Sequence, residues 1–465
     1  MAMALLFIAS LPISAFAEDW YLEDGSVAVT ATSSTSETGE TVTTQSVVQT
    51  SSDGSVYKQS SNDTNTVITQ RDTKTATGNT VTINAADENA TAEVTLKDVN
   101  IDASKTGKAA VSTNGEGDVT IELDGDNTVK SGANHAGVEK NNDGSLTITD
   151  ENNDNASLEV TGGDGGAGIG GARGDAEVSN ITINGGKITA KGGYRGAGIG
   201  SARNSGYATK ASNITINGGE VYAYGGGLAA GIGGGYNGSA SNVSIKDAKV
   251  YAEGGEGGAG IGGGYMGKLT GTVVISGDAK VNGIGYIRED NEHGKGNCAA
   301  IGNGVQYVNN RFVDGEEATL DTSKLTTKGK IECYARDKYG NITLTKTIIG
   351  TYVPPVAAKA AEQTVKLYNV VDKDGKSISY KTEVKDGVLT VTVDADYAAL
   401  TGAVSGISVL TAQGIKTVVF VTSGATSTFD LADLSAKGSG TYKLTHDGAT
   451  VTFTLGTTDI SEILK

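Results

Sequence analysis

Tyrosine and basic side chains recur at matching positions in the middle of the chain. Four residues after a repeated isoleucine stand Arg173, Arg203, Tyr236 and Tyr265. A tyrosine ring can stack on the apolar face of a sugar while its hydroxyl bonds to sugar hydroxyls. An arginine offers a two-pronged donor that suits the carboxylate of a uronic acid. These residue types therefore indicate a surface that binds carbohydrate.

A second set occupies outward positions of a neighbouring predicted strand: Lys191, Tyr222, Tyr224 and Tyr251. If successive repeats stack about 4.8 Å apart, both sets form ladders along one flank. The alternative is purely structural, because tyrosine favours exposed strands and pairs with its neighbours across them. The sequence leaves both interpretations open.

Acidic turns suggest a metal site. Asp124 and Asp126 lie in one predicted turn, and Asp150 and Asp154 lie in the corresponding turn of the next repeat. Carboxylates and carbonyls at such turns could hold Ca²⁺, although the spacing does not match a twelve-residue EF-hand loop. Solvated turn acids are the plainer explanation.

Two cysteines, Cys298 and Cys333, bracket the end of the repeats. In an exported chain they could form a disulfide, and we expect one. Cys333 also fits a buried position in an alternating strand.

The sequence offers no catalytic constellation. A glycoside hydrolase needs two carboxylates at a set separation, and the repeats show only scattered acids. His135, His293 and His446 fall in loop-like contexts that do not support a Ser-His-Asp system. We expect binding without catalysis and keep a calcium-dependent, pectate-lyase-like enzyme as an alternative.

The element that must position these residues is a repeat. The tripeptide Ala-(Ala/Gly)-(Val/Ile) occurs seven times, ending at Val111, Val138, Ile169, Ile199, Ile232, Ile261 and Ile301. A period of about 30 residues is typical of solenoids, in which stacked copies bury a shared core. Double glycines in most units exclude helical repeats, because each glycine would cost about 1 kcal/mol in a helix.

Each unit holds two short alternating strands, with the tripeptide as a third. Alternation points Ile181, Ile183 and Ile188 inward, together with their equivalents in the next two units. Asn180, Asn213 and Asn242 fall at equivalent turns before a strand, where stacked amides could bond from coil to coil. The fold class is therefore all-β, a parallel β-helix with three strands per coil.

Composition divides the chain into five parts. We expect a signal peptide at 1–17, a Ser/Thr-rich segment or cap at 18–74, the β-helix at 75–311, a terminal coil or hairpin and linker at 312–353, and a small β-rich module at 354–465. The net charge of −17 argues against nucleic acid as a partner, since nucleic-acid binding relies on Lys and Arg. Secretion or a cell-surface location follows from the expected signal peptide, and no other run reaches membrane length.

The segment Val119–Thr161 resembles a family of bacterial exported carbohydrate-binding domains with a polysaccharide-lyase-like parallel β-helix. The similarity is carried by Val119-Thr120-Ile121-Glu122-Leu123, Asn127-Thr128-Val129, Ala136-Gly137-Val138 and Gly144-Ser145-Leu146-Thr147-Ile148. The Gly-Gly-x-Gly-Ala-Gly-Ile-Gly-Gly coils are similar to those in cell-surface proteins of gut Firmicutes. The resemblance implies binding of plant-type or pectic polysaccharide, with calcium and without established cleavage.

The sequence thus favours an exported β-helix that binds polysaccharide without cleaving it. A second alternative is an adhesive surface stalk, in which the solenoid is a spacer and the C-terminal module binds the cell wall or a host protein.

Overall fold

A computed structural model describes residues 19–465 except 36–40, 64, 152–154, 205–206, 354–367, 374, 377, 386, 405–406, 413 and 439. The expected signal peptide at 1–17 lies outside the described residues, as do positions 354–367 at the start of the expected C-terminal module. Internal contacts divide the chain into two units, Met1–Pro354 and Pro355–Lys465. No helix among the described residues is long and apolar enough to cross a membrane.

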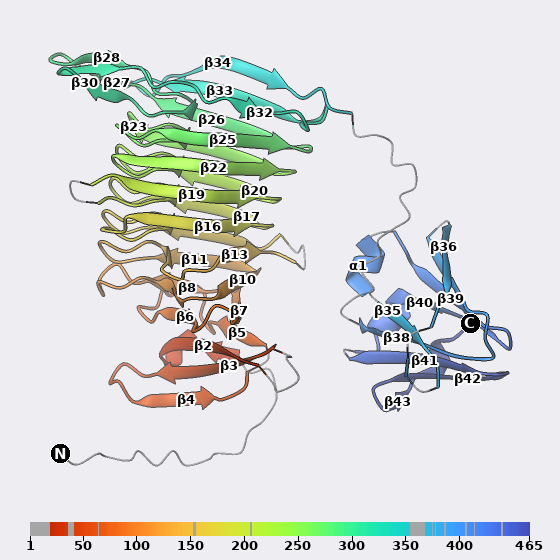
Figure 1. Cartoon of the computed structure of the whole chain (residues 1–465). Coiled ribbons are helices and arrows are strands. Elements are labelled where there is room, and N and C mark those ends of the chain that lie inside the picture. Colours follow the sequence, from red (N-terminus) through yellow and green to blue (C-terminus); the bar gives the residue numbers. More distant parts are fainter. Residues whose placement is uncertain are drawn as a thin grey trace. The chain divides into compact units, whose positions relative to one another are not determined.

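The first unit is a parallel β-helix, as predicted, and its stacked coils form three sheets (Figure 1). Sheet A contains, in spatial order, β1 (Asp19–Tyr21), β5 (Thr66–Thr69), β7 (Thr91–Lys97), β10 (Asp118–Asp124), β13 (Leu146–Thr149), β16 (Glu177–Ile183), β19 (Thr209–Ile216), β22 (Gly238–Lys246), β25 (Leu269–Ser276) and β32 (Leu320–Asp321). Sheet C contains β8 (Asn100–Asp102), β11 (Asp126–Lys130), β14 (Ser157–Thr161), β17 (Lys187–Lys191), β20 (Glu220–Tyr224), β23 (Lys249–Glu256), β26 (Lys280–Tyr286), β33 (Lys330–Arg336) and β34 (Ile342–Ile349).

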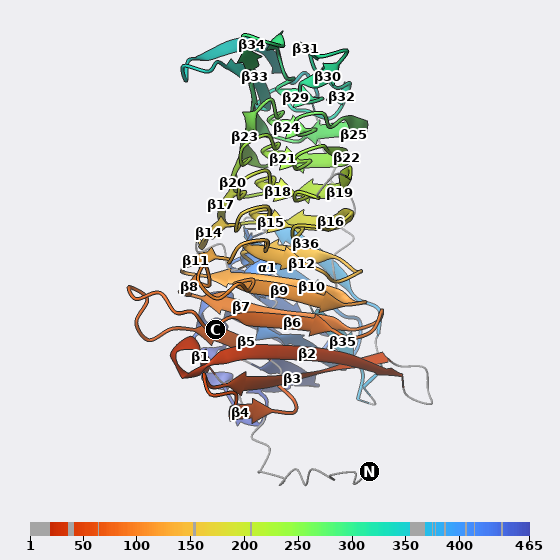
Figure 2. The same ribbon diagram turned by 90° about the vertical axis from the view of Figure 1, so that its left-hand side faces the viewer.

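Sheet B is the stack of repeated tripeptides. It contains β4 (Val56–Ser60), β3 (Thr41–Thr50), β2 (Ser26–Thr35), β6 (Val81–Ala85), β9 (Val111–Gly115), β12 (Val138–Lys140), β15 (Ile169–Gly170), β18 (Ile199–Gly200), β21 (Ile232–Gly233), β24 (Ile261–Gly262) and β29 (Ile301–Gly302). All seven copies pair in one register, from Val111 to Ile301. Figure 2 shows these short strands stacked above one another.

Both ends of the solenoid finish in antiparallel pairs. β2, β3 and β4 form an antiparallel layer at the N-terminal end, and β33 pairs with β34 at the other. Since β1, β2 and β5 also pair in parallel with later coils, the solenoid reaches Asp19 rather than starting at position 75. Two small hairpins, β27 (Arg288–Asp290) with β28 (Gly294–Gly296) and β30 (Gln306–Val308) with β31 (Arg311–Val313), interrupt the last coils.

Aliphatic side chains fill the solenoid interior. Ile181, Ile183 and Ile188 are fully buried, and each stacks on an equivalent aliphatic residue of the next coil. This confirms the predicted faces. Burial of such a side chain contributes about 1.5–3 kcal/mol, so each coil adds a comparable layer of hydrophobic stabilisation.

A column of asparagines joins three coils, as expected. The Nδ2 of Asn213 donates to Oδ1 of Asn180 at 3.0 Å, and the Nδ2 of Asn242 donates to Oδ1 of Asn213 at 3.1 Å. The column lies inside β16, β19 and β22 rather than before them. Each asparagine has a positive φ and kinks its strand, a conformation that asparagine tolerates better than most residues.

The second unit is a separate β-rich module with its own core. One sheet contains β35 (Tyr368–Val371), β38 (Tyr397–Ala403), β41 (Thr441–Asp447), β42 (Thr450–Leu455) and β43 (Thr458–Asp459). The other contains β36 (Lys381–Lys385), β37 (Val388–Thr392), β39 (Thr417–Val421) and β40 (Thr426–Asp430). Two short helices, α1 (Ile407–Ala412) and α2 (Leu431–Ser435), accompany them, and Phe420, Phe429 and Phe453 are fully buried.

A candidate ligand-binding face on sheet C

The structure divides the predicted strip into two parts. Tyr222 and Tyr251 lie opposite each other on β20 and β23, and Tyr224 pairs in register with Lys191 on β17. These four residues share the outer face of sheet C. The residues that follow the repeated isoleucine lie instead in corner loops after sheet B, so the strip is not continuous.

The three tyrosines of sheet C contact one another. The ring centroids of Tyr222 and Tyr251 are 6.2 Å apart, and those of Tyr224 and Tyr251 are 5.7 Å apart, with tilted planes. The Tyr222 hydroxyl donates to Glu220, and the Tyr251 hydroxyl donates to Oε2 of Glu253 at 2.8 Å. Burial and the hydrogen bond to the Glu253 carboxylate raise the pKa of Tyr251.

Tyr222 and Tyr251 line a cavity of about 350 Å³. The cavity continues onto β26 and β33, where Asn282 and Glu332 occupy the same column as the two tyrosines. Its remaining polar lining is basic and consists of Lys249, Lys280, Lys328 and Lys330. We call this set of eight residues the lysine–tyrosine face.

Three of these lysines stack directly on one another. Lys249, Lys280 and Lys330 pair in register on consecutive strands of sheet C. Lys249 forms an ion pair with Glu220, and Lys330 forms one with Glu332 at 2.7 Å. Within the described part of the chain, Lys280 has no carboxylate partner. Like charges stacked on neighbouring strands repel, so an anionic ligand at Lys280 would relieve unfavourable electrostatics.

The lysines were not anticipated from the sequence. Lys249, Lys280 and Lys330 begin equivalent strands, but the segment between Lys280 and Lys330 is longer than the regular repeat because it contains the β27–β28 and β30–β31 hairpins. The detectable signal was the shared Lys-(Val/Ile) start of each strand.

The corner-loop residues do not form the expected platform. Tyr236 and Tyr265 stack with ring centroids 6.0 Å apart, but Tyr265 is only 7% exposed. The guanidinium of Arg288 lies 4.7 Å from the Tyr265 centroid, and that of Arg195 lies 4.5 Å from the Tyr236 centroid. Because neighbouring side chains cover these rings, the outward position expected for Tyr265 is not observed.

Two of the three basic residues of the predicted strip, Arg173 and Lys191, already have side-chain partners in the protein. Arg173 is exposed, and its Nη1 donates to Oδ1 of Asn134 at 2.9 Å. Arg203 is half-buried in the next corner loop, where its backbone carbonyl accepts from Gly174. Lys191 forms an exposed ion pair with Glu159 at 2.6 Å. None of the three lines the cavity.

The predicted calcium ligands lie at the ends of sheets A and C. Asp124 forms an ion pair with Lys97 at 2.7 Å, and Asp126 accepts from the Ser157 hydroxyl at 2.6 Å. Asp150 is buried after β13, whereas Asp154 lies outside the described residues. Among the described residues, no group of three or more His, Cys, Asp or Glu side chains is arranged to hold a metal ion. Calcium binding stays a prediction.

The expected disulfide is wrong, because Cys298 and Cys333 are free thiols. The Cys298 Sγ donates to the backbone carbonyl of Tyr286 at 2.8 Å, within a cluster that includes Phe312. Cys333 is buried on β33 as part of the solenoid core. The cysteines therefore serve as small apolar residues in two different clusters.

His446 also differs from expectation, since it lies within β41 rather than in a loop. It is fully buried, with Nε2 2.9 Å from the Ser427 hydroxyl and Nδ1 3.1 Å from the Thr422 hydroxyl. Burial lowers the pKa of this imidazole.

Comparison with known proteins supports the fold. A family model described as a β-helix repeat matches residues 181–203, 214–236 and 243–265. No curated protein and no solved structure matches the chain. Each matched segment runs from an inward residue of sheet A to the corner after sheet B, so the chain contains at least three β-helix repeats.

Proposed function

We propose that this protein binds an acidic polysaccharide, without cleaving it, at the lysine–tyrosine face. A pectic polymer with uronic acid carboxylates suits the chemistry best. The observation that supports the proposal is the cavity in which two tyrosine rings lie beside the lysine column. This concentration of cations occurs in a chain whose net charge is −17, so it is not a general property of the surface.

The three kinds of side chain offer complementary interactions. The rings of Tyr222 and Tyr251 provide apolar area for the face of a sugar. Lys280 can bind a carboxylate, and a charge-assisted contact of this kind contributes about 1.5–3 kcal/mol when it is shielded from water. Asn282 can donate to and accept from ring hydroxyls.

The lining of the cavity supports binding rather than hydrolysis. Glu332, the one carboxylate among the described residues of this lining, is held by Lys330, whereas glycoside hydrolysis requires two carboxyl groups across the scissile bond. A lyase is tested separately by incubating the protein with polygalacturonate and calcium and following the absorbance of unsaturated product. We expect no increase.

The proposal is tested by retention on immobilised polygalacturonate. We expect Lys280→Gln and Tyr251→Ala each to weaken binding about tenfold, which corresponds to about 1.4 kcal/mol. Lys210→Gln is the matched control, because it removes one exposed positive charge from sheet A. A thermal melt of each variant verifies folding.

Unchanged retention of both variants would exclude the lysine–tyrosine face. Binding would then lie elsewhere, and the C-terminal module would be the next candidate, as in the adhesive-stalk alternative. Repeating the measurement with a chelator tests the calcium prediction independently, because the lysine–tyrosine face itself needs no metal.

A further inference from the structure

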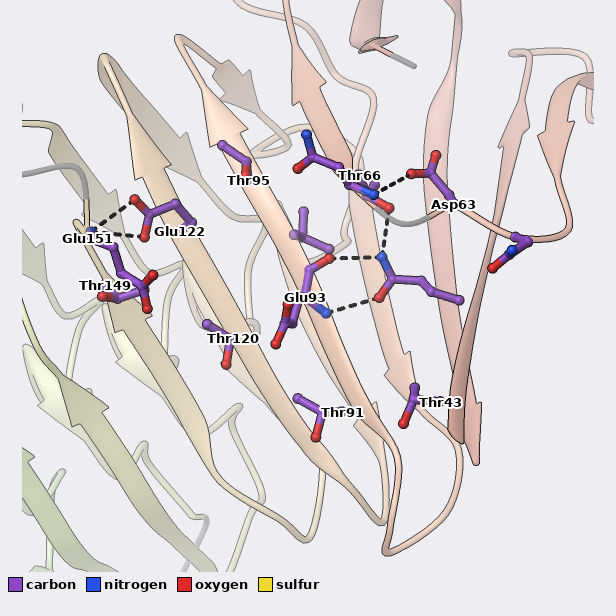
Figure 3. A pocket seen from close by; sticks show the side chains of 14 residues that line it. Thr43, Asp63, Thr66, Thr91, Glu93, Thr95, Thr120, Glu122, Thr149 and Glu151 are labelled. Atoms are coloured by element: carbon purple, nitrogen blue, oxygen red, sulfur yellow. Dashed lines mark hydrogen bonds between the residues drawn. The ribbon is translucent and has the colours of Figure 1, made fainter. Parts of the chain in front are cut away.

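A second hollow lies away from sheet C, over the first strands of sheet A. It has a volume of about 520 Å³ and is lined by residues of β3, β5, β7, β10 and β13 and of the connections beside them (Figure 3). We call it the threonine–glutamate groove. Its lining consists of Thr43, Gln45, Asn62, Asp63, Asn65, Thr66, Thr91, Glu93, Val94, Thr95, Thr120, Glu122, Thr149 and Glu151.

Hydroxyls and carboxylates alternate across this surface. Glu93 on β7 lies opposite Thr120 on β10, whereas Thr95 on β7 lies opposite Glu122 on β10. Glu122 in turn lies opposite Thr149 on β13. Glu93 and Glu122 therefore each have a threonine beside them on the same strand and another across the sheet. Such neighbours are about 5–7 Å apart, which is the scale of a sugar ring's substituents.

Several of these polar groups are not engaged by the protein. Thr149 is only 5% exposed, yet among the described residues its hydroxyl has no hydrogen-bond partner. The hydroxyls of Thr91, Thr95 and Thr120, which are half-buried, likewise have no hydrogen-bond partner among the described residues. Thr149 lines the groove, so its hydroxyl is free to donate to and accept from a ligand that enters there.

The charge of the groove is entirely negative. As far as the structure describes it, its lining includes four carboxylates and no lysine or arginine. Asp63 accepts from the indole N–H of Trp20 at 2.8 Å, and Glu122 accepts from the backbone N–H of Glu151 at 2.9 Å. Within the described residues, the Glu93 carboxylate has neither an ion pair nor a hydrogen bond. The groove thus offers hydrogen bonds and uncompensated negative charge together.

We infer that the threonine–glutamate groove binds an amino sugar polymer with free, protonated amines. The hydroxyls of the polymer form hydrogen bonds with the threonine and amide side chains of the groove. The ammonium groups of the polymer form ion pairs with Glu93 and Glu122. Ammonium–carboxylate contacts are charge-assisted and stronger than neutral hydrogen bonds. No aromatic ring is among the described residues that line the groove, so affinity depends on charge and falls as salt is added.

This site is independent of the proposed function. The lysine–tyrosine face lies on sheet C and selects anions, whereas the groove lies on sheet A and selects cations. Substitutions at Lys280 or Tyr251 should leave the groove unaffected, so the two proposals can fail separately.

The test is calorimetric titration of the full chain with a hexamer of β-1,4-linked glucosamine at mildly acidic pH, where the sugar amines are protonated. We expect binding that Glu93→Gln/Glu122→Gln weakens at least about tenfold. Glu88→Gln/Glu116→Gln is the matched control, because it removes the same charge from exposed positions outside the groove. This control should change the affinity less than about twofold. Thermal melts establish that both double variants fold.

Two comparison ligands define the recognised chemistry. The N-acetylated hexamer keeps the sugar framework without the charge, and it should bind at least about tenfold more weakly. Spermine keeps the charge without the sugar, and it should also bind more weakly. Equal affinity for spermine would mean that the groove recognises cationic chains in general and would overturn the sugar assignment. Equal loss in both double variants, or no binding of the glucosamine hexamer, would overturn the site itself.

Discussion

Replacing Gly200 by alanine should disrupt the stack of sheet B more than any φ strain alone can explain. Gly200 has φ +134°, and a Cβ built there would lie 2.9 Å from the carbonyl carbon of Gly233 in the next coil and closer still to its oxygen. That oxygen also accepts the backbone N–H of Ser201 at 2.9 Å. Gly170, Gly233 and Gly262 have the same conformation and the same obstruction.

The expected loss in the free energy of unfolding is obtained by comparison with Gly174, which has φ +107° but no atom within 4 Å of a built Cβ. Both substitutions carry backbone strain of about 1–3 kcal/mol. Gly200→Ala adds overpacking of about 1–3 kcal/mol, and a weakened Ser201 hydrogen bond adds about 1 kcal/mol. We therefore expect Gly200→Ala to lower the free energy of unfolding by about 2–4 kcal/mol more than Gly174→Ala.

Urea unfolding followed by fluorescence measures this difference. Trp20 is the single tryptophan, and it is fully buried in β1, so its emission reports on the β-helix and not on the C-terminal module. Hydrogen exchange of the amides around Ile199 and Ile232 detects coils that open locally, since solenoids can lose cooperativity. Equal destabilisation by the two substitutions would refute the claim that the next coil excludes a side chain here.

Three further predictions concern other parts of the chain. Cys298 and Cys333 should react with a thiol reagent only after unfolding, because both are buried free thiols. Burial raises the pKa of both thiols, that of Cys333 to about 11. A mass shift corresponding to a disulfide in the native protein would contradict this prediction. Asn213→Gly should keep the positive φ but remove two amide hydrogen bonds, so urea unfolding should show a loss of about 1–2 kcal/mol, and an unchanged midpoint would argue against the asparagine column. The C-terminal module should lose stability as the pH falls below about 6.5, because His446 takes up a proton more readily in the unfolded state than in the folded state. Circular dichroism melts of the wild type and of His446→Gln at several pH values check this. An equal pH dependence in both proteins would exclude His446 as the cause.

Much of the solenoid was predictable because its signals are local and repeated. The copies ending at Ile199, Ile232 and Ile261 pair in register, and the alternating residues of each strand occupy the predicted faces. Repetition of one unit multiplies the same weak signal, so errors at single positions cancel. The asparagine column was found in the same way.

The candidate site was less predictable because insertions reshape it. Tyr265 is covered by Arg288 and Phe312, which come from the hairpins that interrupt the last coils. The same interruption separates Lys280 from Lys330 along the chain, although the two residues are neighbours on sheet C. Alignment of repeats cannot reveal a contact made by a segment that the repeat does not contain.

The column of glycines has a consequence for how such a chain can change in length. Because every coil meets its neighbours through the same backbone contacts, a whole winding can be duplicated or deleted while the windings on either side still match. Each event would lengthen or shorten the rod by about 4.8 Å. Gene duplication could thereby adjust the spacing between the threonine–glutamate groove and the lysine–tyrosine face while leaving the side chains of both unaltered.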